Sequence, residues 1–389
     1  MKFLLESSNI KIGQEAQKFH SLLVSGISKT FNNGIETLNV IPVTSKSHMK
    51  RFWNVKSEII ENVKYSYIPF INLPLLKNII TFFYTFYKIV IWSINNKTEK
   101  KIVLCDILRL SGAIGALIGC KLTNTTIIAI VTDVPGLMIT DKSKNNLKKR
   151  LFNKLGKIFI TKYSGYILLT DQMNEIVNTK NKPYIIIEGL VDEKMASKDN
   201  NIESKAKERV LIYAGGIYER LGVKKLIEAF MMLSDTNLRL HLYGPGEMQK
   251  VMPNYMLLDK RIKYFGVIPN YEIVECELKA TLLVNPRPSN EEFTKYSFPS
   301  KNMEYMVSGT PIVTTKLPGM PEEYLQYVYL FNDESVEGIF NTLDKLLSKS
   351  TAELHEFGIN AKSFVLREKS NIVQATKIIK FIKNRFITE

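Results

Sequence analysis

The sequence has few of the residues that build metal sites and disulfide frameworks. Its three cysteines, Cys105, Cys120 and Cys276, lie far apart in the chain, and none is part of a CxxC pair. The four histidines are dispersed as well, and neither an HExxH nor an Asp-x-Asp motif occurs. This pattern argues against a disulfide framework and a zinc site, and it favours a reducing compartment. We therefore expect no metal and no cofactor.

Long uninterrupted hydrophobic runs are also scarce. The most apolar stretch, residues 73–92 (LPLLKNIITFFYTFYKIVIW), has the length of about 20 residues that spans a bilayer, but Lys77 and Lys88 interrupt it. We expect a helix that is buried or lies in the membrane interface rather than a transmembrane span. Met1–Ser8 is predicted to form a short strand and not a signal peptide.

The chain is rich in positive charge, and this charge is unevenly placed. Residues 1–200 hold 28 Lys and Arg against 15 Asp and Glu, whereas residues 201–389 hold 25 against 23. The first half therefore favours a membrane surface, a phosphate-bearing substrate or nucleic acid as its partner. Nucleic acid is the weakest of these, because aromatic recognition motifs and zinc-finger spacing are absent.

Two domains are expected, because 389 residues are too many for one ordinary core. Short β-branched runs alternate with helical patterns in both halves, which predicts two doubly wound α/β domains with parallel sheets. The predicted strands are residues 2–7, 101–106, 125–133, 165–170 and 184–189 in the first half, and 209–216, 238–244, 261–266, 281–286, 310–315 and 327–331 in the second.

A polar segment separates the two patterned halves. We interpret residues 191–208 as an interdomain linker between an N-terminal domain of residues 1–190 and a C-terminal domain of residues 209–365. The last helix is predicted near residues 362–387, and residues 366–389 are expected to return to the N-terminal domain.

Glycines follow several of the predicted strands, where ligands bind in open α/β sheets. Gly215 and Gly216 precede a helix whose amino end could hold a phosphate, and Arg220 in the same turn could contact a diphosphate. An ordinary strand–helix turn with a solvated arginine explains the same residues. Gly244 and Gly246 follow the next strand, and Val267 follows the one after it.

The segment of residues 288–315 (PSNEEFTKYSFPSKNMEYMVSGTPIVTT) is the richest in functional side chains. Pro299 favours a helix start and Gly309 a helix stop, so Phe298, Ser300 and Lys301 lie at the amino end of a helix. Amides, a hydroxyl and a cation at one place suit a diphosphate.

Carboxylates and hydroxyls flank this helix start. Glu304 lies one turn after Lys301 on the same face and could accept hydrogen bonds from a ribose diol. Glu291, Glu292, Thr294 and Tyr296 precede the helix and could contact the hydroxyls of a sugar. The alternative is a surface ion pair between Lys301 and Glu304.

The order of these motifs resembles a nucleotide-sugar glycosyltransferase of the GT-B fold, in particular the retaining family 4, the group 1 glycosyl transferases of bacterial polysaccharide synthesis. The resemblance covers roughly residues 184–324 and rests on the segments YAGGIYERLGVKKLIEAF, LYGPGE, YFGVIPN and FPSKNMEYMVSGTPIVTTKLPGMPEEY. The segment EGLVD also stands where the family has its Asn-Gly-Val-Asp signature.

The resemblance implies two Rossmann-like domains facing across a cleft and a nucleotide-sugar donor, with UDP or another nucleoside diphosphate. It also implies metal-independent transfer with retention to a lipid-linked or saccharide acceptor, in the synthesis of capsule, exopolysaccharide or lipopolysaccharide. The donor-binding candidates are Gly13, Gly215, Gly216, Tyr243, Gly244, Gly246, Val267, Tyr296, Phe298, Ser300 and Glu304.

The sequence departs from the family pattern at its charged residues. The family has two glutamates separated by seven residues (Glu-x7-Glu), but the residue at this distance before Glu304 is Tyr296. Glu291 or Glu292 is therefore the candidate for the first glutamate. Of these two, Glu292 is our catalytic candidate. The family's arginine and lysine after the glycine fall on Gly216 and Leu221.

Other cations could replace that arginine and lysine. Lys224 is a further candidate, and we favour Arg220 and Lys301 as the groups that stabilise the leaving diphosphate. In the N-terminal domain, Asp133 follows a strand and is the candidate that orients the acceptor, although a turn or capping aspartate is the competing interpretation.

The basic segment of residues 142–162 has leucine and phenylalanine at helical spacing among lysines and an arginine, with no acidic residue. We expect it to dock the protein on the anionic cytoplasmic leaflet, as a peripheral enzyme. Its apolar residues could instead pack on the sheet. Competing functions are a nucleotide-sugar epimerase with this fold and an inactive accessory subunit.

Overall fold

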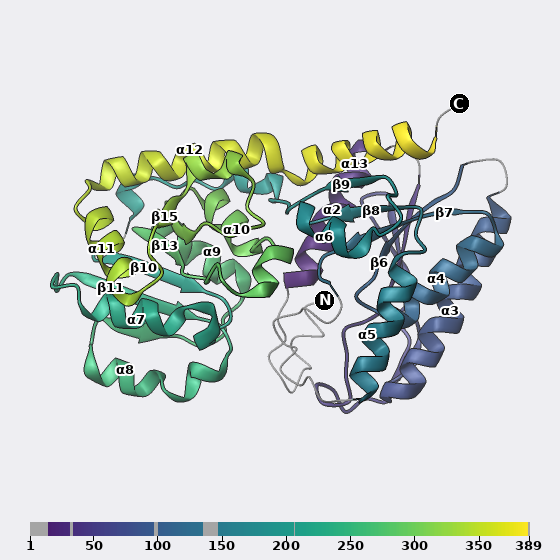
Figure 1. The fold of residues 1–389 in the computed structure, drawn as a ribbon, viewed down its shortest axis with the longest axis horizontal. Coiled ribbons are helices and arrows are strands. Elements are labelled where there is room, and N and C mark those ends of the chain that lie inside the picture. The colour runs from purple at the N-terminus through teal and green to yellow at the C-terminus, as the bar shows by residue number, and fades with distance from the viewer. Residues whose placement is uncertain (1–14, 32–33, 97–99, 135–146, 206, 388–389) are drawn as a thin grey trace. The chain divides into compact units, whose positions relative to one another are not determined.

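The computed structural model describes residues 15–31, 34–96, 100–134, 147–205 and 207–387 of the chain (Figure 1). They divide into two compact units. Unit 1 consists of Met1–Glu188 with Gln374–Glu389, and unit 2 consists of Gly189–Val373. Both units are α/β with parallel sheets, as the alternating pattern predicts.

The main sheet of unit 1 has four parallel strands in the order β6-β7-β8-β9. Its strands are β6 (Ile102–Asp106), β7 (Thr126–Val131), β8 (Gly165–Leu168) and β9 (Tyr184–Ile186). β7 and β8 are almost wholly buried, as expected for continuous apolar strands in a sheet that is covered on both faces. The predicted strand of residues 2–7 lies outside the described residues.

Unit 1 also contains short strands that the sequence pattern did not predict. β1 (Ile35–Asn39), β4 (Val63–Tyr67) and β3 (Glu58–Ile60) form one sheet, and β2 (Phe52–Trp53) pairs antiparallel with β5 (Phe70–Ile71). A small cluster of buried residues, Ile41, Val43, Trp53 and Phe70, joins them. The strands are two to five residues long and carry exposed polar groups. Their alternation of apolar and polar residues is therefore too short to predict a strand.

Two apolar helices of unit 1 pack closely on each other. α3 (Pro74–Asn95) lies against α4 (Leu110–Leu122). A Cβ at Gly115 would approach the carbonyl oxygen of Phe82 to 2.5 Å, so glycine lets the two helix backbones come this near. The other α-helices described before unit 2 are α2 (Glu15–Thr30), α5 (Leu147–Ile160) and α6 (Asp171–Val177).

The carboxyl-terminal helical region differs from the prediction of one helix near residues 362–387. It contains α12 (Thr351–Lys369) and α13 (Asn371–Phe386), which are separated by the extended residue Ser370. The break is fixed by the chain near Val191, whose N–H donates to Lys369 O and whose carbonyl accepts from the N–H of Asn371. Residues 374–386 of α13 belong to unit 1, where Ala375 and Ile378 are fully buried.

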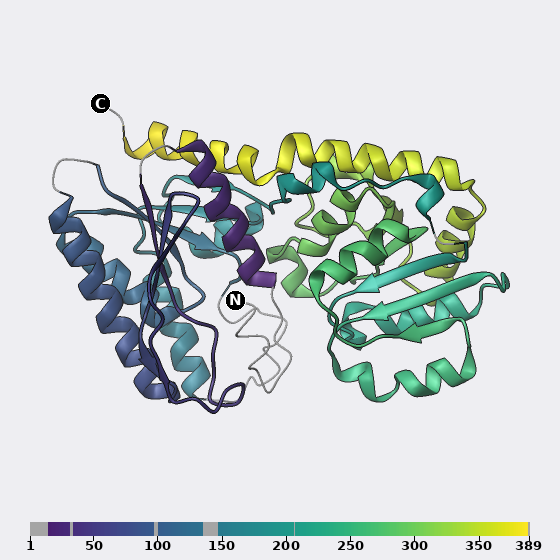
Figure 2. The same ribbon diagram turned by 180° about the vertical axis from the view of Figure 1, so that it is seen from behind.

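Unit 2 is built on six parallel strands in the order β12-β11-β10-β13-β14-β15 (Figure 2). They are β10 (Arg209–Ala214), β11 (Leu238–Tyr243), β12 (Ile262–Tyr264), β13 (Leu282–Asn285), β14 (Ile312–Thr315) and β15 (Tyr329–Phe331). The helices α7 (Val223–Met231), α8 (Met252–Leu258), α9 (Asn270–Lys279) and α10 (Ser300–Ser308) connect the strands from β10 to β14, and α11 (Val336–Leu347) follows β15. The strands predicted for the second half of the chain are confirmed, with small differences at their ends.

Residues 191–208 lie within unit 2 and contain the short helices η1 (Glu193–Ser197) and η2 (Ile202–Ser204). The buried Asn200 side chain donates to Ser308 O at 2.8 Å, and Lys205 Nζ donates to Leu278 O at 2.9 Å. Burial lowers the pKa of Lys205 to about 7. These side-chain contacts attach the segment to the body of unit 2. The sequence has no periodic pattern of apolar residues here that would predict them.

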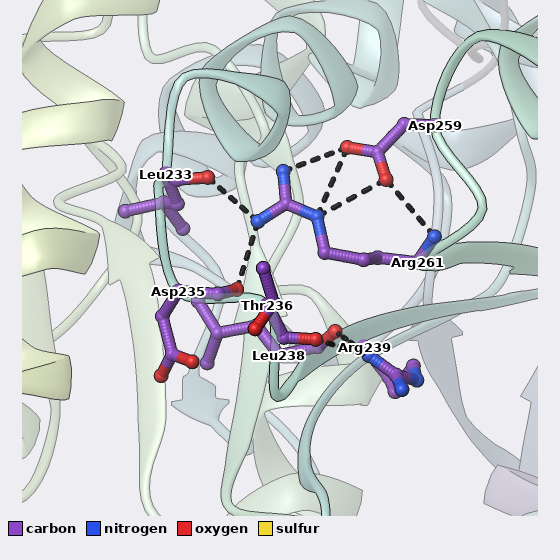
Figure 3. Close-up of polar contacts among 7 residues, drawn as sticks. All are labelled: Leu233, Asp235, Thr236, Leu238, Arg239, Asp259 and Arg261. Carbon is purple, nitrogen blue, oxygen red and sulfur yellow. Dashed lines mark hydrogen bonds and ion pairs between the residues drawn. The ribbon is translucent and has the colours of Figure 1, made fainter.

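An ion pair in unit 2 holds together the loops that precede β11 and β12 (Figure 3). Arg261 Nη2 lies 2.7 Å from Asp259 Oδ2, and Arg261 Nη1 donates to the carbonyl oxygens of Leu233 and Asp235 at 2.6 and 2.9 Å. The guanidinium thus joins the start of β12 to the turn before β11. Hydrogen bonding from Arg261 lowers the pKa of Asp259, against a smaller opposing effect of burial.

Candidate functional site

Three turns lie side by side at the carboxyl ends of β10, β11 and β12. The N–H of Gly215 donates to Tyr243 O at 2.9 Å, and the N–H of Gly244 donates to Gly266 O at 2.7 Å. The N–H of Ile217 donates to the carbonyl oxygen of Pro245 at 2.8 Å. These backbone bonds fix the turns to one another, so the predicted glycine motifs form one continuous edge of the sheet.

Two of these positions require glycine. Gly215 and Gly244 have φ angles of +148° and +118°, which L side chains rarely adopt. A Cβ at Gly244 would overlap the carbonyl oxygen of Gly215, and a Cβ at Gly215 would overlap Cε and Nζ of Lys301. The turn after β10 therefore keeps its backbone open to the lysine of α10.

Lys301 lies in the first turn of α10, against the Gly215 turn. Its Nζ is 3.9 Å from the centroid of the Tyr213 ring. The hydroxyl of the buried Tyr305 accepts from the N–H of Ala214 at 2.7 Å, which fixes α10 to the end of β10. The amide of Asn285 donates to the Oδ1 of Asn302 at 2.7 Å and attaches the same helix to β13. The predicted neighbourhood of the glycine turn and the helix after Pro299 is thus present in unit 2.

Glu304 lies one turn after Lys301 and is half-buried. Its Oε1 accepts from Nδ2 of Asn270, the first residue of α9, at 2.7 Å. This bond orients the carboxylate and leaves it further acceptor sites. A cation and a carboxylate on one face of α10 provide separate partners for a phosphate and for a diol.

Two arginines lie near one aromatic ring of unit 2, that of Phe293. The Cζ atoms of Arg220 and Arg287 lie 4.8 and 4.7 Å from the centroid of the Phe293 ring. Arg287 is only 8% exposed, and its Nη2 donates to Ser297 Oγ at 3.0 Å. Sequence reasoning selected Arg220 and missed Arg287. The signal for Arg287 is its position two residues after β13, at the same edge of the sheet as the glycine turns.

The loop before α10 contains the short helix η5 (Glu292–Tyr296). Glu292 is exposed, whereas Glu291 and Tyr296 are half-buried. Thr294 is buried, and its hydroxyl donates to the carbonyl oxygen of Glu291 at 2.5 Å and to that of Ser289 at 3.0 Å. Thr294 therefore shapes the loop, and the glutamates remain the candidates for contact with a sugar.

The other donor-binding candidates of unit 2 divide into exposed and packed positions. Ser300 is exposed and Val267 is half-buried. Phe298 is buried with its ring 5.0 Å from that of Tyr324. Tyr243 is also buried and donates to Cys276 Sγ at 3.6 Å. The last two side chains form part of the core, so their contribution to a site would come from the backbone.

Unit 1 presents acidic residues at the carboxyl ends of two neighbouring strands. Asp106 ends β6, and Asp133, which is half-buried, follows β7 by two residues. His20 Nε2 of α2 lies 3.1 Å from Asp106 Oδ2, and Asp106 Oδ1 accepts from the N–H of Leu108 at 2.9 Å. Sequence reasoning missed His20, because no local motif joins it to Asp106. Gly13 lies outside the described residues.

Within the described part of the chain, no group of three or more His, Cys, Asp or Glu side chains could hold a metal ion. The residues of the site offer Lys301, the two arginines and backbone amides to an anion, and carboxylates to hydroxyl groups.

Residues 195–364 match the family model of glycosyl transferases group 1. No match is found among curated proteins.

Several solved structures share the fold of the whole chain. Sucrose-phosphate synthase from Thermosynechococcus elongatus has a TM-score of 0.67 at 13% identity and covers 97% of this chain and 95% of its own. A glycosyltransferase from Rickettsia africae has a TM-score of 0.64 at 13% identity and covers 95% of each chain. The Anabaena protein HepE in complex with UDP has a TM-score of 0.59 at 13% identity and covers 83% of this chain and 86% of its own.

These likenesses, all far below 25% identity, show the fold, which is the GT-B fold expected from the sequence. Together with the match of residues 195–364 to the group 1 glycosyl transferase domain, they support a glycosyltransferase enzyme.

Proposed function

We propose that the protein transfers a sugar from a nucleoside-diphosphate sugar, such as a UDP-sugar, to a lipid-linked or saccharide acceptor. The observation that carries this proposal is the contact of Lys301 with the Gly215 turn, with Glu304 one turn further along α10. The cation and the amides at the start of α10 would bind the diphosphate, and the carboxylate would accept from the ribose diol. The UDP and UDP-glucose complexes of the structurally similar HepE support this choice of donor.

In the transfer, the bond between the anomeric carbon and the diphosphate oxygen breaks, and a bond to the acceptor oxygen forms. The diphosphate keeps the electron pair, and its growing negative charge is stabilised by Lys301, Arg220 and Arg287 without a metal ion. The acceptor hydroxyl loses its proton to the departing diphosphate oxygen. We propose that the anomeric configuration is retained, with Glu292 or Glu291 beside the donor sugar.

The acceptor would be bound by unit 1. Asp133 and the pair of His20 and Asp106 stand at the carboxyl edge of its sheet, where a hydroxyl group could be oriented. His20 Nε2 lies 3.1 Å from Asp106 Oδ2, and this contact orients the imidazole next to the proposed acceptor region.

We further propose a role in surface polysaccharide synthesis, at the inner face of the cell membrane. A structural neighbour described as a lipopolysaccharide outer core galactosyltransferase supports the first part, at a TM-score of 0.56 and 15% identity. The excess of lysine and arginine in residues 1–200 supports the second. In α5, Lys154, Leu155, Lys157 and Ile158 are exposed together, as a helix at an anionic surface requires.

A panel of nucleotide sugars tests the proposed donor. Calorimetry should find tight binding of one nucleoside diphosphate and its sugar, and slow hydrolysis of that sugar nucleotide should release the free sugar. Lys301→Ala should abolish both signals, whereas Lys316→Ala, the same change in an exposed lysine beyond β14, should leave them unchanged. Failure of every nucleotide to bind would overturn the proposal. An isomerised nucleotide sugar formed without acceptor would establish the epimerase instead.

A further inference from the structure

α3 is an amphipathic helix whose faces are reversed. Its buried side chains are polar, namely Lys77, Thr81, Thr85 and Ser93. Its exposed side chains are large and apolar: Leu75, Leu76, Ile79, Phe83, Tyr87, Ile91 and Ile94. A helix on the surface of a water-soluble domain normally has the opposite arrangement. The exposed apolar side chains of α3 are called the α3 stripe below.

The buried face attaches α3 firmly to unit 1. Lys77 Nζ donates to Ile41 O at 3.0 Å and to Val43 O at 2.5 Å, and it lies 3.9 Å from the Phe70 ring centroid. At the other end, the hydroxyls of Ser93 and Thr125 are 2.5 Å apart. The polar groups at both ends of the buried face are thus bonded inside the unit, although Thr85 Oγ1 between them has no hydrogen-bond partner in the described part of the chain. The side chains of the α3 stripe point away from this face and are exposed among the described residues.

The α3 stripe is continuous along the helix. Ile79, Phe83 and Tyr87 are spaced by four residues and therefore lie above one another on one face. Among the described residues, α3 is the helix whose length and composition would allow it to cross a membrane. Only 17% of its most apolar stretch is buried inside the protein. α3 runs along the outer edge of unit 1 in Figure 2. Apolar surface of this extent marks an interaction site.

The charged residues close to the α3 stripe in the sequence, and those of the adjoining helix α4, are of one sign. Residues 62–98 contain no aspartate or glutamate, and Lys88 is exposed on α3 itself. The sequence of α4 is also without acidic residues, and Lys121 and Leu122 are exposed at its end. An apolar stripe with lysines beside it matches the acyl chains and the anionic headgroups of a lipid surface.

We propose that α3 lies in the plane of an anionic bilayer and buries the α3 stripe among the lipids. A membrane-spanning position would take Lys77 out of its bonds to Ile41 O and Val43 O and place it in hydrocarbon, at a large cost. A symmetric contact between two copies would bring Lys88 of each toward a surface that has no carboxylate on this helix. A bilayer satisfies both the apolar and the charged groups.

This docking surface extends the proposed membrane location and does not rest on sugar transfer. The test uses the full chain and sedimentation with vesicles of phosphatidylcholine, with or without phosphatidylglycerol. The doubly substituted variant Ile79→Ser, Phe83→Ser removes two side chains that are 44% and 62% exposed. The matched control is Leu257→Ser, Leu258→Ser in α8 of unit 2, where the side chains are 72% and 71% exposed.

The wild type and the α8 control should bind phosphatidylglycerol vesicles equally. The α3 variant should bind with a partition coefficient at least about tenfold lower, because both side chains would leave water on docking. Lys88→Glu keeps the apolar stripe and should weaken binding only to the anionic vesicles. Equal binding of the α3 variant and the wild type would overturn the proposal. So would sedimentation of the lipid-free protein as a dimer that the α3 variant dissociates.

Discussion

Lys301 lies against the backbone of Gly215, so closely that a Cβ on the glycine would overlap the lysine side chain. This contact joins the end of the first strand of unit 2 to the first turn of α10. It places a cation at a strand end where the glycine has no side chain. A side chain at position 215 would displace the lysine, so the two residues depend on each other.

Gly215→Ala should therefore weaken binding of the nucleoside diphosphate by about tenfold or more, since displacement of the lysine would cost at least about 1.4 kcal/mol. The measurement is calorimetric titration, with thermal unfolding recorded in parallel. Gly309→Ala is the control, because Gly309 has a φ of +80° at the far end of the same helix. It should lose stability by about 1–2 kcal/mol and keep its affinity. Equal affinities of the two variants would show that the contact has no part in binding.

Glu304→Ala should lower the affinity for the nucleoside diphosphate by about 10- to 100-fold, the value of hydrogen bonds to a charged group. With the 2′,3′-dideoxy nucleotide, the wild type and the variant should bind alike, because the diol is missing. Asn270→Ala should have a smaller effect, since Asn270 only orients the carboxylate through its 2.7 Å hydrogen bond. If the substitution weakens binding of the dideoxy nucleotide as much as that of the ribonucleotide, Glu304 does not contact the diol.

Arg287→Met should reduce kcat by about 100-fold, as expected for loss of a charge that stabilises the leaving group. The methionine keeps apolar contact with Phe293, so circular dichroism should show an intact fold. Arg220→Met, at the same ring, serves as the comparison. Unchanged turnover of the Arg287 variant would assign this guanidinium to packing with Phe293 and Ser297.

His20→Ala and Asp106→Asn should lower the rate of transfer to the acceptor and leave hydrolysis of the donor unchanged. The reason is that both residues belong to unit 1, whereas the donor candidates among the described residues belong to unit 2. His355→Ala, in α12, is the control for loss of a histidine. Equal loss of transfer and hydrolysis would place the His20–Asp106 pair outside acceptor binding.

Asp259→Asn should remove a pH-dependent part of the stability. The pKa of Asp259 is lowered by hydrogen bonds from Arg261, so its carboxylate stabilises the fold above the unfolded pKa of about 3.9 and loses this effect as the pH falls through the folded pKa. The variant should be less stable by about 1–3 kcal/mol at pH 7, and the difference should shrink in acid. Urea unfolding at neutral and acid pH measures it. A difference that stays constant with pH would contradict the assignment.

The sequence predicts the parallel strands of both units well, because β10, β13 and β7 are apolar runs bounded by glycine, proline or aspartate. It does not predict β2, β3 or β5, whose two or three residues are too few to show a period. The break at Ser370 was missed as well, since it depends on bonds to Val191 that no local pattern reveals.

The candidate site divides in the same way. The glycine turns, Lys301 and Glu304 follow from local spacing and from the family resemblance. Arg287 and His20 become visible only when the fold places Phe293 and Asp106 beside them. The reversed faces of α3 are also hidden in the sequence, because composition alone does not show which side of the helix faces the protein.

The helix α13 has a consequence for the order in which the protein folds during its synthesis. Ala375 and Ile378 are fully buried, and a Cβ at Gly165 of unit 1 would lie 2.7 Å from Phe386 Cζ. Unit 1 therefore lacks part of its core until the ribosome has released residues 374–386. Unit 2, made of one uninterrupted segment, can complete its core first, although its translation begins later.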